Sequence, residues 1–289
     1  MKLLITGASG MLARDVLSAA SAARHLPVCF SHRQLDITDA NLVQECLSQQ
    51  RPDAIVNCAA FTDVDGAQSH PDRAFAVNAA GAANLASAAA SLSIPMLHVS
   101  TDYVFGGDPR TCLADCQRPY VESDEPAPLN VYGESKLRGE RLVLAASDEH
   151  LVVRTSWLFG AGGVSFVSRM LQLASQRREL QVVDDQVGCP TWTGHLAPAL
   201  IDLLQRRLSG LVHLCGSGHV SWHRFAQEIF EQANCPCRLH AIRSDALPRP
   251  ARRPAFSALQ SERADVVALP DWREGLACHL AAAAEIIEA

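Results

Sequence analysis

The chain has 289 residues, and 48% of them are hydrophobic, which suits a soluble globular protein with a sizeable core. Its formal net charge is −6 at pH 7 with both signs interspersed, which excludes the basic face that nucleic acid or an anionic membrane requires. No stretch approaches the ~20 consecutive apolar residues of a membrane span, and the first apolar run is too short for a signal peptide. We therefore expect a cytoplasmic protein with one large domain and a smaller C-terminal partner.

Ten cysteines are scattered along the chain, and only Cys112/Cys116 and Cys235/Cys237 lie close together in sequence. Neither pair is matched by a second pair at the spacing of a zinc site. We expect most of the thiols to be buried apolar groups in a reducing compartment, and we predict no metal site and no structural disulfide.

A short apolar run at 2–6 is followed at once by a glycine-rich turn that opens a helix. Gly7 allows the tight turn, and Gly10 lets backbone N–H groups approach a pyrophosphate at the positive end of the helix. Ala13 occupies the position where close packing of helix on strand favours a small residue. The sequence therefore predicts a dinucleotide site that includes Gly7, Gly10, Met11 and Leu12.

The second apolar run, 27–30, ends in Ser31-His32-Arg33. An acidic residue here binds the ribose hydroxyls of NAD, whereas an arginine suits the 2′-phosphate of NADP. Arg33 therefore predicts NADPH as the cofactor, with acceptance of NADH left open. Asp36 and Ile37 are assigned to the same site, although Asp36 either contacts the adenine or only orders the turn.

The third strand, 53–58, leads into Ala59-Ala60-Phe61-Thr62, whose small residues let the chain pass close to the ribose and nicotinamide. A long alanine-rich helix is predicted over 71–92 and a fourth strand over 95–100. Ligands bind outside the carboxyl ends of the strands in an open parallel sheet, so Thr101 is predicted to point into the site. A threonine at a strand end is more often a cap or a turn residue, but no helix is predicted to follow this one.

Tyr132 and Lys136 lie four residues apart in a run with a helical apolar period, so their side chains share one helical face. A free tyrosine titrates near ~10, and an ammonium beside it favours the phenolate. Lowering the pKa of the tyrosine by roughly three units requires about 4 kcal/mol. The pair is predicted to be a tuned acid/base for a carbon–oxygen centre; the alternative is a solvated pair without function.

Strands and helices alternate as far as a fifth strand at 151–155, which predicts a parallel sheet covered on both faces. A long polar loop, 106–130, interrupts them. Beyond residue 155 the elements are short, with helices near 165–176, 194–208 and 222–233 and strands near 180–183 and 211–214. We predict a Rossmann-type doubly wound domain in residues 1–155 and a smaller α/β substrate-binding domain in 156–289, with one or two strands returning to the sheet.

Four motifs together resemble the extended short-chain dehydrogenases/reductases: Thr6-Gly7-x-x-Gly10, Asn57-x-Ala59-Ala60, Ser100-Thr101-Asp102-Tyr103-Val104-Phe105 and Tyr132-x-x-x-Lys136. Within that group, five further stretches are similar to the dTDP-4-dehydrorhamnose reductase family: 60–65, 128–133, 154–157, 185–191, and 252–254 with Ser257. These stretches follow one another in family order over nearly the whole chain.

The resemblance implies an oxidoreductase that reduces the C4 keto group of a nucleotide-linked 6-deoxyhexose, dTDP-4-dehydro-L-rhamnose being the first choice. Tyr132 would donate the proton to the keto oxygen, while Lys136 holds the nicotinamide ribose and lowers the pKa of Tyr132. Thr101 would hydrogen-bond the substrate oxygen. The implied substrate-binding residues are Thr62, Val64, Thr101, Asp102, Tyr103, Trp157 and Arg253.

Some of these assignments have plain alternatives. By its chemistry alone, Trp157 fits the wall of a sugar pocket or the core equally well. Arg253 suits the diphosphate of a nucleotide sugar, or it lies solvated in its proline-rich loop. The chain departs from the family pattern at Gln68, where Glu is common, and in a longer loop around 111–118.

Two other functions stay open. A 4,6-dehydratase of this superfamily carries Glu directly after the Thr101-Asp102 pair, where this chain has Tyr103, and an epimerase keeps NAD bound, which Arg33 disfavours. A non-catalytic subunit similar to the β subunit of methionine adenosyltransferase is the second option, but the intact Thr101, Tyr132 and Lys136 favour an enzyme. The nucleotide base, the stereochemistry of the sugar and the oligomeric state, a homodimer included, are left open by the sequence.

Overall fold

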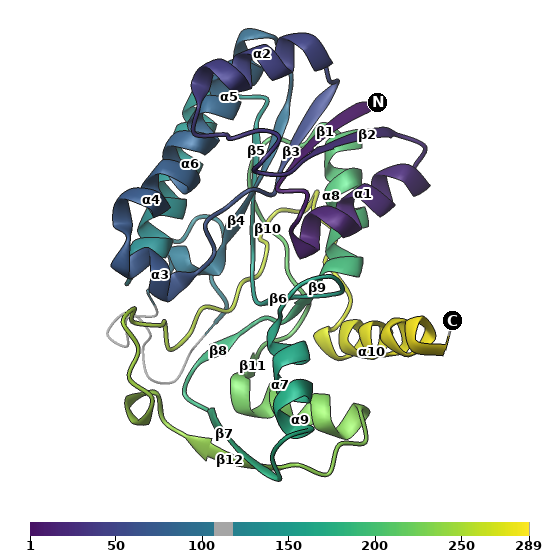
Figure 1. The fold of residues 1–289 in the computed structure, drawn as a ribbon. Helices are drawn as coiled ribbons and strands as arrows, with labels where there is room; N and C mark the ends of the chain where they lie inside the picture. The colour runs from purple at the N-terminus through teal and green to yellow at the C-terminus, as the bar shows by residue number, and fades with distance from the viewer. Residues whose placement is uncertain (107–117, 289) are drawn as a thin grey trace.

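The computed structural model describes residues 1–106 and 118–288 and contains a larger and a smaller lobe (Figure 1). The larger lobe is built on a six-stranded sheet in the order β10-β5-β4-β3-β1-β2, and every neighbouring pair in it is parallel. Its strands are β1 (Lys2–Thr6), β2 (Leu26–Phe30), β3 (Ala54–Asn57), β4 (Met96–Thr101), β5 (Leu151–Thr155) and β10 (Gly210–His213). The predicted Rossmann-type parallel sheet is confirmed.

Helices cover both faces of this sheet (Figure 1). Leu3 and Ile5 of β1 pack against the helices of one face, and Leu4, between them, packs against those of the other. Because both faces are buried, the strands are mainly apolar instead of alternating regularly with polar residues. The first face carries α1 (Met11–Ala22) and α8 (Thr193–Gln205), and the second carries α2 (Ala40–Gln50), α5 (Ala82–Ser91) and α6 (Val131–Ala146).

The prediction of one continuous α-helix over 71–92 is wrong in the middle of that range. The chain forms α3 (Val64–Ser69) and α4 (Pro71–Phe75), passes through a π-helix at Ala76–Gly81 and continues as α5. Asn78, inside the π-helix, accepts a hydrogen bond from the backbone N of Phe61 at 2.8 Å and donates one to the hydroxyl of Ser135 at 2.9 Å. These hydrogen bonds to two distant segments stabilise the π-helical turn. The alanine-rich sequence around Asn78 does not predict them.

The C-terminal half contributes to both lobes. Its β10 pairs with β5 at one edge of the main sheet, and its α8 packs against α1. The smaller lobe packs α7 (Phe166–Ala174) and α9 (Trp222–Gln232) against a parallel pair of strands, β7 (Glu179–Val183) and β12 (Arg238–Ile242). The remaining elements are β6 (Leu158–Phe159), β8 (Val187–Gly188), β9 (Thr191–Trp192), β11 (Val220–Ser221), two 3-10 helices (Asp102–Val104, Ser244–Ala246) and α10 (Trp272–Glu288).

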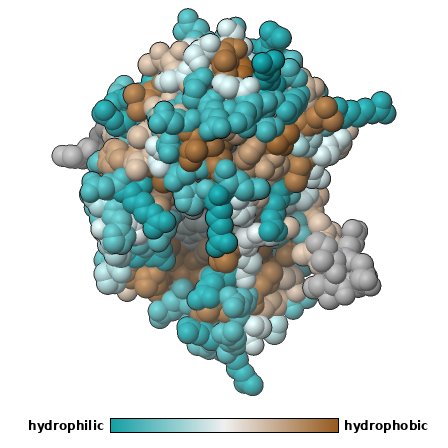
Figure 2. Space-filling view, turned by 45° about the horizontal axis from the view of Figure 1, so that its top comes forward, coloured by the Kyte–Doolittle hydropathy of each residue, from teal (hydrophilic) through white to brown (hydrophobic). Residues whose placement is uncertain are grey.

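The two lobes face each other across a hollow that is visible on the molecular surface (Figure 2). Cys112 and Cys116, in the loop predicted to be longer than usual, lie outside the described residues. Among the residues that the structure does describe, none of the helices is long and apolar enough to cross a membrane.

Candidate active site

The glycine turn after β1 has the geometry predicted for a dinucleotide site. Gly7 has φ = 71°, and a Cβ there would lie 2.8 Å from the backbone N of Ala59, so only glycine fits without strain. Gly10 is the N-cap of α1 and offers no side chain to the first N–H groups of the helix. Those N–H groups and the helix dipole are suited to an anion such as a pyrophosphate.

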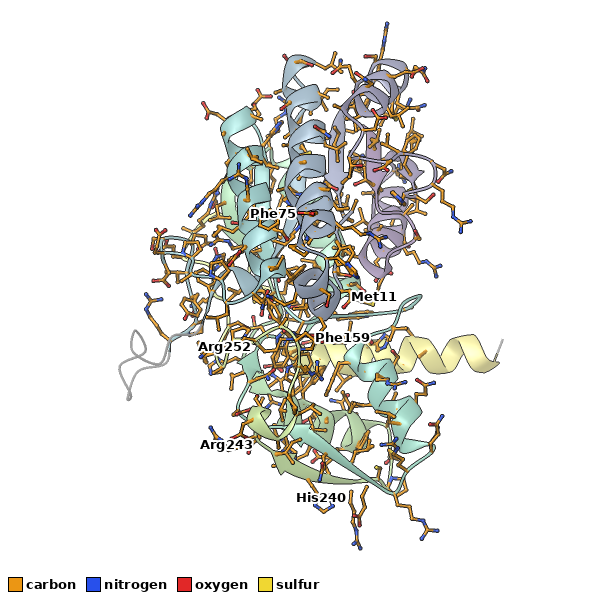
Figure 3. All side chains as sticks on the ribbon, turned by 60° about the vertical axis from the view of Figure 1, so that its left-hand side comes forward. Met11, Phe75, Phe159, His240, Arg243 and Arg252 are labelled. Carbon is orange, nitrogen blue, oxygen red and sulfur yellow. The ribbon has the colours of Figure 1, made fainter. Side chains whose placement is uncertain are left out.

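A cavity of about 440 Å³ lies where the carboxyl ends of β3, β4 and β5 meet the first turns of α1 and α6. Met11 of α1 and Phe159 of β6 mark this junction of the two lobes in Figure 3. The structure brings ten of the predicted site residues to the cavity wall: Gly10, Met11, Leu12, Ala60, Thr62, Thr101, Asp102, Tyr132, Lys136 and Trp157.

A second cavity, of about 590 Å³, lies beside the first and is lined mainly by the smaller lobe. Three predicted substrate residues, Val64, Tyr103 and Arg253, line it. Trp157 faces the first cavity and Trp222 the second, and their rings stack at a centroid distance of 3.4 Å. Trp157 therefore lines a cavity wall, and it also packs against the core of the smaller lobe, so its contact with a sugar stays a prediction.

Six predicted cofactor residues line neither cavity: Gly7, Arg33, Asp36, Ile37, Ala59 and Phe61. Arg33 is exposed in the turn that follows β2. The carboxylate of Asp36 accepts hydrogen bonds from the hydroxyl and the backbone N of Thr38, which lower its pKa and order this turn. Ile37 is buried in the core. Contact of these residues with a cofactor stays a prediction.

The first turn of α6 is fixed by three contacts. Asn130 caps it by accepting a hydrogen bond from the backbone N of Gly133 at 2.9 Å, and Gln68 accepts one from the backbone N of Val131 at 3.2 Å. Gln68 thus provides an uncharged cap to this helix. A Cβ on Gly133 would overlap the backbone oxygen of Tyr103, so this glycine lets α6 approach the end of β4 closely. The approach places Tyr132 beside Thr101.

Thr101 does cap a helix, contrary to the prediction. Its hydroxyl accepts a hydrogen bond at 3.2 Å from the backbone N of Tyr103, at the start of the 3-10 helix Asp102–Val104. A single 3-10 turn has too few residues to give a periodic signal in the sequence. The same hydroxyl lines the cavity and hydrogen-bonds the phenol of Tyr132.

The acid/base pair differs in one respect from the prediction. Burial raises the pKa of Tyr132 to about 12, although the hydrogen bond with Thr101 lowers it in part. Burial also lowers the pKa of Lys136 to about 8, against a smaller raising effect of Glu140. The predicted depression of the pKa of Tyr132 is therefore wrong, because burial is the largest effect on this phenol. Tyr132 is a phenol at pH 7 and can donate a proton.

Asp102 is buried beside this pair, and burial raises its pKa to about 6. Its carboxylate accepts hydrogen bonds from the hydroxyl of Ser257 at 2.5 Å and from that of Thr101 at 3.1 Å. Ser257 belongs to the proline-rich segment of the C-terminal half, so Asp102 connects that segment to the end of β4.

Arg253 is not solvated, since only 10% of its side chain is exposed. Its two terminal nitrogens donate to the two carboxylate oxygens of Asp65, at 2.8 and 3.0 Å. Although burial opposes it, the pairing lowers the pKa of Asp65. The guanidinium thus lies fixed in the wall of the second cavity, and its contact with a diphosphate stays a prediction.

Sequence reasoning missed the polar groups behind the cavity. Asn57 and His98 are fully buried in β3 and β4, and the hydroxyl of Thr155 is buried at the cavity with no hydrogen-bond partner in the described residues. A histidine and an asparagine inside otherwise apolar strands were the available signal, since buried polar groups need partners. The orphan hydroxyl of Thr155 fits a cavity that binds a polar molecule, as does the bare helix end at Gly10.

Comparison with known proteins places the chain in a family. A family model described as the RmlD substrate binding domain matches residues 1–285. The dTDP-4-dehydrorhamnose reductase of Mycolicibacterium smegmatis is 41% identical over 281 residues, which are 95% of this chain and 84% of that one. A dTDP-4-keto-6-deoxy-D-glucose reductase of Streptomyces niveus is 38% identical over 94% of this chain and 90% of its own length.

A solved structure agrees with these relatives. The dTDP-4-dehydrorhamnose reductase of Bacillus anthracis, in complex with NADP, is 34% identical and superposes with a TM-score of 0.91, covering 97% of this chain and 99% of that chain. The match of the family model over nearly the whole length agrees with the motifs gathered around the cavity. The chain belongs to the dTDP-4-dehydrorhamnose reductase (RmlD) family.

Proposed function

We propose that the protein is an NADPH-dependent oxidoreductase that reduces the C4 keto group of dTDP-4-dehydro-L-rhamnose to give dTDP-L-rhamnose. One observation supports this above all: Tyr132 lies with Thr101 and Lys136 in one cavity, whose wall also includes Gly10 of the glycine turn. Family membership supports the substrate class, because relatives over most of the chain carry the names of such reductases.

In this mechanism the chain supplies the proton and fixes the carbonyl. Tyr132 donates its phenolic proton to the keto oxygen, and Thr101 holds that oxygen in place by a hydrogen bond. When bound, NADPH supplies the hydride that reduces C4. Lys136, on the same helical face as Tyr132, holds the nicotinamide ribose.

The residues present fit a bound NADPH. Gly7, Gly10, Met11 and Leu12 form the turn and the helix end for the pyrophosphate, and the backbone over 59–62 passes along the same cavity. Arg33 is exposed after β2 and free to meet the 2′-phosphate. Support for NADPH also comes from the relative of known structure that was solved with NADP.

The sugar and its nucleotide would occupy the two cavities. The stacked Trp157 and Trp222 form a rigid apolar wall against which a sugar ring packs. Arg253, held by Asp65, presents its guanidinium to the larger cavity, where a diphosphate would lie. On this basis residues 156–289 are proposed as the mainly substrate-binding part of the molecule, and residues 1–155 as the cofactor-binding part.

Two alternatives keep some support. The Streptomyces niveus relative is named for a different 4-keto sugar, so another nucleotide-sugar 4-ketoreductase is the first. A 4-epimerase or a regulatory subunit is the second. The combination of an arginine after β2 with both Tyr132 and Lys136 is not required by either of these functions, whereas an NADPH-dependent reductase uses it. The net charge of −6 argues against a nucleic-acid partner. A cytoplasmic location and a homodimer stay predictions, the second to be tested by light scattering.

The deciding experiment compares substrates with the purified protein. Oxidation of NADPH is followed with dTDP-4-dehydro-L-rhamnose and with the UDP- and GDP-linked 4-keto sugars. The expected result is fastest turnover of the dTDP substrate, with dTDP-L-rhamnose as the product identified by NMR. A higher kcat/KM for a UDP or GDP substrate would assign a different nucleotide, and no oxidation with any of the three would overturn the proposed activity.

A further inference from the structure

A buried chain of hydrogen bonds runs from Lys136 into the sheet. Its members are nearly inaccessible to solvent, with exposed fractions of 1% for Thr6, 0% for Asn57 and His98, and 1% for Lys136. The hydroxyl of Thr6 lies 2.7 Å from Oδ1 of Asn57, whose Nδ2 lies 2.9 Å from Nδ1 of His98. The other ring nitrogen, Nε2, lies 3.3 Å from Nζ of Lys136.

The direction of these hydrogen bonds is set by a backbone group. The N–H of Ala59, which can only donate, points at Oδ1 of Asn57 at 3.1 Å, so the amide oxygen must lie at that end. The amide nitrogen of Asn57 therefore donates to Nδ1 of His98. Because Nδ1 accepts, a neutral imidazole carries its proton on Nε2, facing Lys136. A doubly protonated ring has no acceptor for Asn57, and burial lowers the pKa of His98 well below its ordinary value.

This arrangement has a consequence for the charge on Lys136. Its Nζ donates a hydrogen bond to the backbone oxygen of Val99 at 2.8 Å. An uncharged amine can also accept a hydrogen bond from the N–H of His98. An ammonium has no lone pair, so two donors would then point at each other. The hydrogen-bond pattern in the structure is therefore that of an unprotonated lysine.

The other titratable groups around Lys136 do not restore its charge. Glu140, one turn along α6, and the thiol of Cys58 both favour the ammonium, but the carboxylate of Glu140 is already paired with Arg154. Burial raises the pKa of Cys58 to about 12, so this thiol is uncharged. Tyr132 on the cavity side is uncharged as well.

We propose that the chain from Thr6 through Asn57 and His98 disfavours protonation of Lys136, so that in alkaline solution Lys136 takes up a proton from solvent when the anionic dinucleotide binds. His98 and Asn57 are positioning residues in this scheme, since they act through Lys136 and touch no ligand. The inference rests on the proposed use of NADPH, whose phosphates add several negative charges near the helix end.

The coupling predicts how NADPH affinity depends on pH. Below a pH of about 8, Lys136 of the free protein is already protonated, and the Kd for NADPH is flat. Above that value, the complex holds a proton that the free protein lacks. The Kd therefore rises about tenfold per pH unit until Lys136 of the complex also loses its proton. The measurement is the titration of protein fluorescence or calorimetric heat with NADPH, and no turnover is involved.

Asn57→Asp tests how Asn57 and His98 affect the protonation of Lys136, because aspartate has nearly the same shape as asparagine. A carboxylate still accepts from Ala59 and Thr6, but its second oxygen now requires an N–H from His98. The ring proton moves to Nδ1, and Nε2 becomes an acceptor for the ammonium of Lys136. We expect the break in the pH dependence of Kd to shift upward by more than about one pH unit, which a merely structural role would not produce.

A control separates the relay from the added charge. In the double variant Asn57→Asp/His98→Leu no side chain can pass the change on to Lys136, so the upward shift measured against His98→Leu should be smaller than that of Asn57→Asp measured against wild type. An equal shift in both backgrounds assigns the effect to the charge alone and overturns the role of His98.

A direct reading of the ring comes from the imidazole ¹⁵N signals of the wild-type free protein, which distinguish a protonated from a bare nitrogen. Protonated Nε2 is expected, and protonated Nδ1 overturns the proposal even if the variants do not fold. A Kd for NADPH that stays constant between about pH 7 and 10 overturns the coupling. Failure of the dTDP substrate in the turnover assay would leave these binding measurements unaffected, so the two proposals fail separately.

Discussion

Tyr132 and Lys136 lie in one cavity, and burial moves the pKa of each toward its uncharged form, to about 12 for the tyrosine and about 8 for the lysine. Each charged form would lose hydration that the neighbouring dipoles do not fully replace. A site of this kind holds its acid protonated until substrate enters. For a ketone reduction this is the required starting state, because the proton moves from the enzyme to the product.

The first residue-scale prediction concerns this proton. Tyr132→Phe removes the donor and leaves the glycine turn of the cofactor site untouched, so kcat should fall by about 10²–10⁴-fold. The Kd for NADPH, measured in the same titration as for wild type, should change little. Retention of more than about a tenth of the wild-type kcat would show that another group supplies the proton.

The second residue-scale prediction concerns cofactor choice. Arg33 is exposed after β2, with no carboxylate before Asp36, and the carboxylate of Asp36 is engaged by Thr38. The charged hydrogen bonds of an arginine to a 2′-phosphate favour NADPH over NADH by about ten- to a hundredfold. Arg33→Ala should largely erase this preference in kcat/KM.

The matched control for Arg33 is Arg177→Ala, which removes the same charge from an exposed position in the smaller lobe, outside both cavities. It should leave the preference between the cofactors unchanged. A wild-type protein that uses NADH as well as NADPH would contradict the prediction, and so would a preference that survives Arg33→Ala.

At the scale of the element, α6 is held against the sheet by a buried ion pair. Glu140 and Arg154 of β5 have side chains that are 2% and 3% exposed, and two of their nitrogen–oxygen contacts measure 2.7 and 3.0 Å. The hydroxyl of Ser100 donates to the same carboxylate at 2.5 Å. Because Tyr132 and Lys136 belong to α6, the ion pair between Glu140 and Arg154 helps to fix the position of both side chains relative to the strand ends.

The element-scale prediction is that Glu140→Gln destabilises the protein by about 3–5 kcal/mol, since it leaves the guanidinium of Arg154 buried and unpaired. The free energy of unfolding in urea measures the loss. Glu134→Gln is the control on the same helix, where an exposed carboxylate near the N-terminus contributes less than about 1 kcal/mol. Equal stabilities for the two variants would show that the buried pair adds nothing over an amide.

The elements differ in how far the sequence predicts them. The strand, turn and helix around Gly7 are encoded locally, by apolar runs and by a glycine that a positive φ requires, so their prediction holds. The π-helix at Asn78 depends on hydrogen bonds to distant segments, which no local pattern contains. The 3-10 turn that Thr101 caps is local, but it has too few residues to give a periodic signal. Burial lowers the pKa of Lys136 and raises that of Tyr132, and four-residue spacing alone does not show burial.

At the scale of the whole molecule, the two halves of the chain complete each other. The core beside α1 includes Leu196, Leu200 and Leu204 of α8, and β10 covers the edge of β5. Asp65 in the first half pairs with Arg253 in the second, and Asp102 with Ser257. The first half therefore relies on the second half for part of the layer that covers one face of its sheet.

The last prediction follows from this dependence. A fragment of residues 1–155 exposes the face of α1 that α8 covers and the strand edge that β10 covers, and a sheet with one partly uncovered apolar face is destabilised in water. We expect the fragment to lack a cooperative thermal unfolding transition by circular dichroism and to bind a hydrophobic dye, whereas the full chain unfolds cooperatively. Extending the fragment to residue 214 restores α8 and β10 and should recover a cooperative transition, even without α9 and β12 of the smaller lobe. A sharp transition in the fragment of 155 residues would show instead that the cofactor-binding half folds independently, with α8 and β10 docking onto a sheet that is already formed.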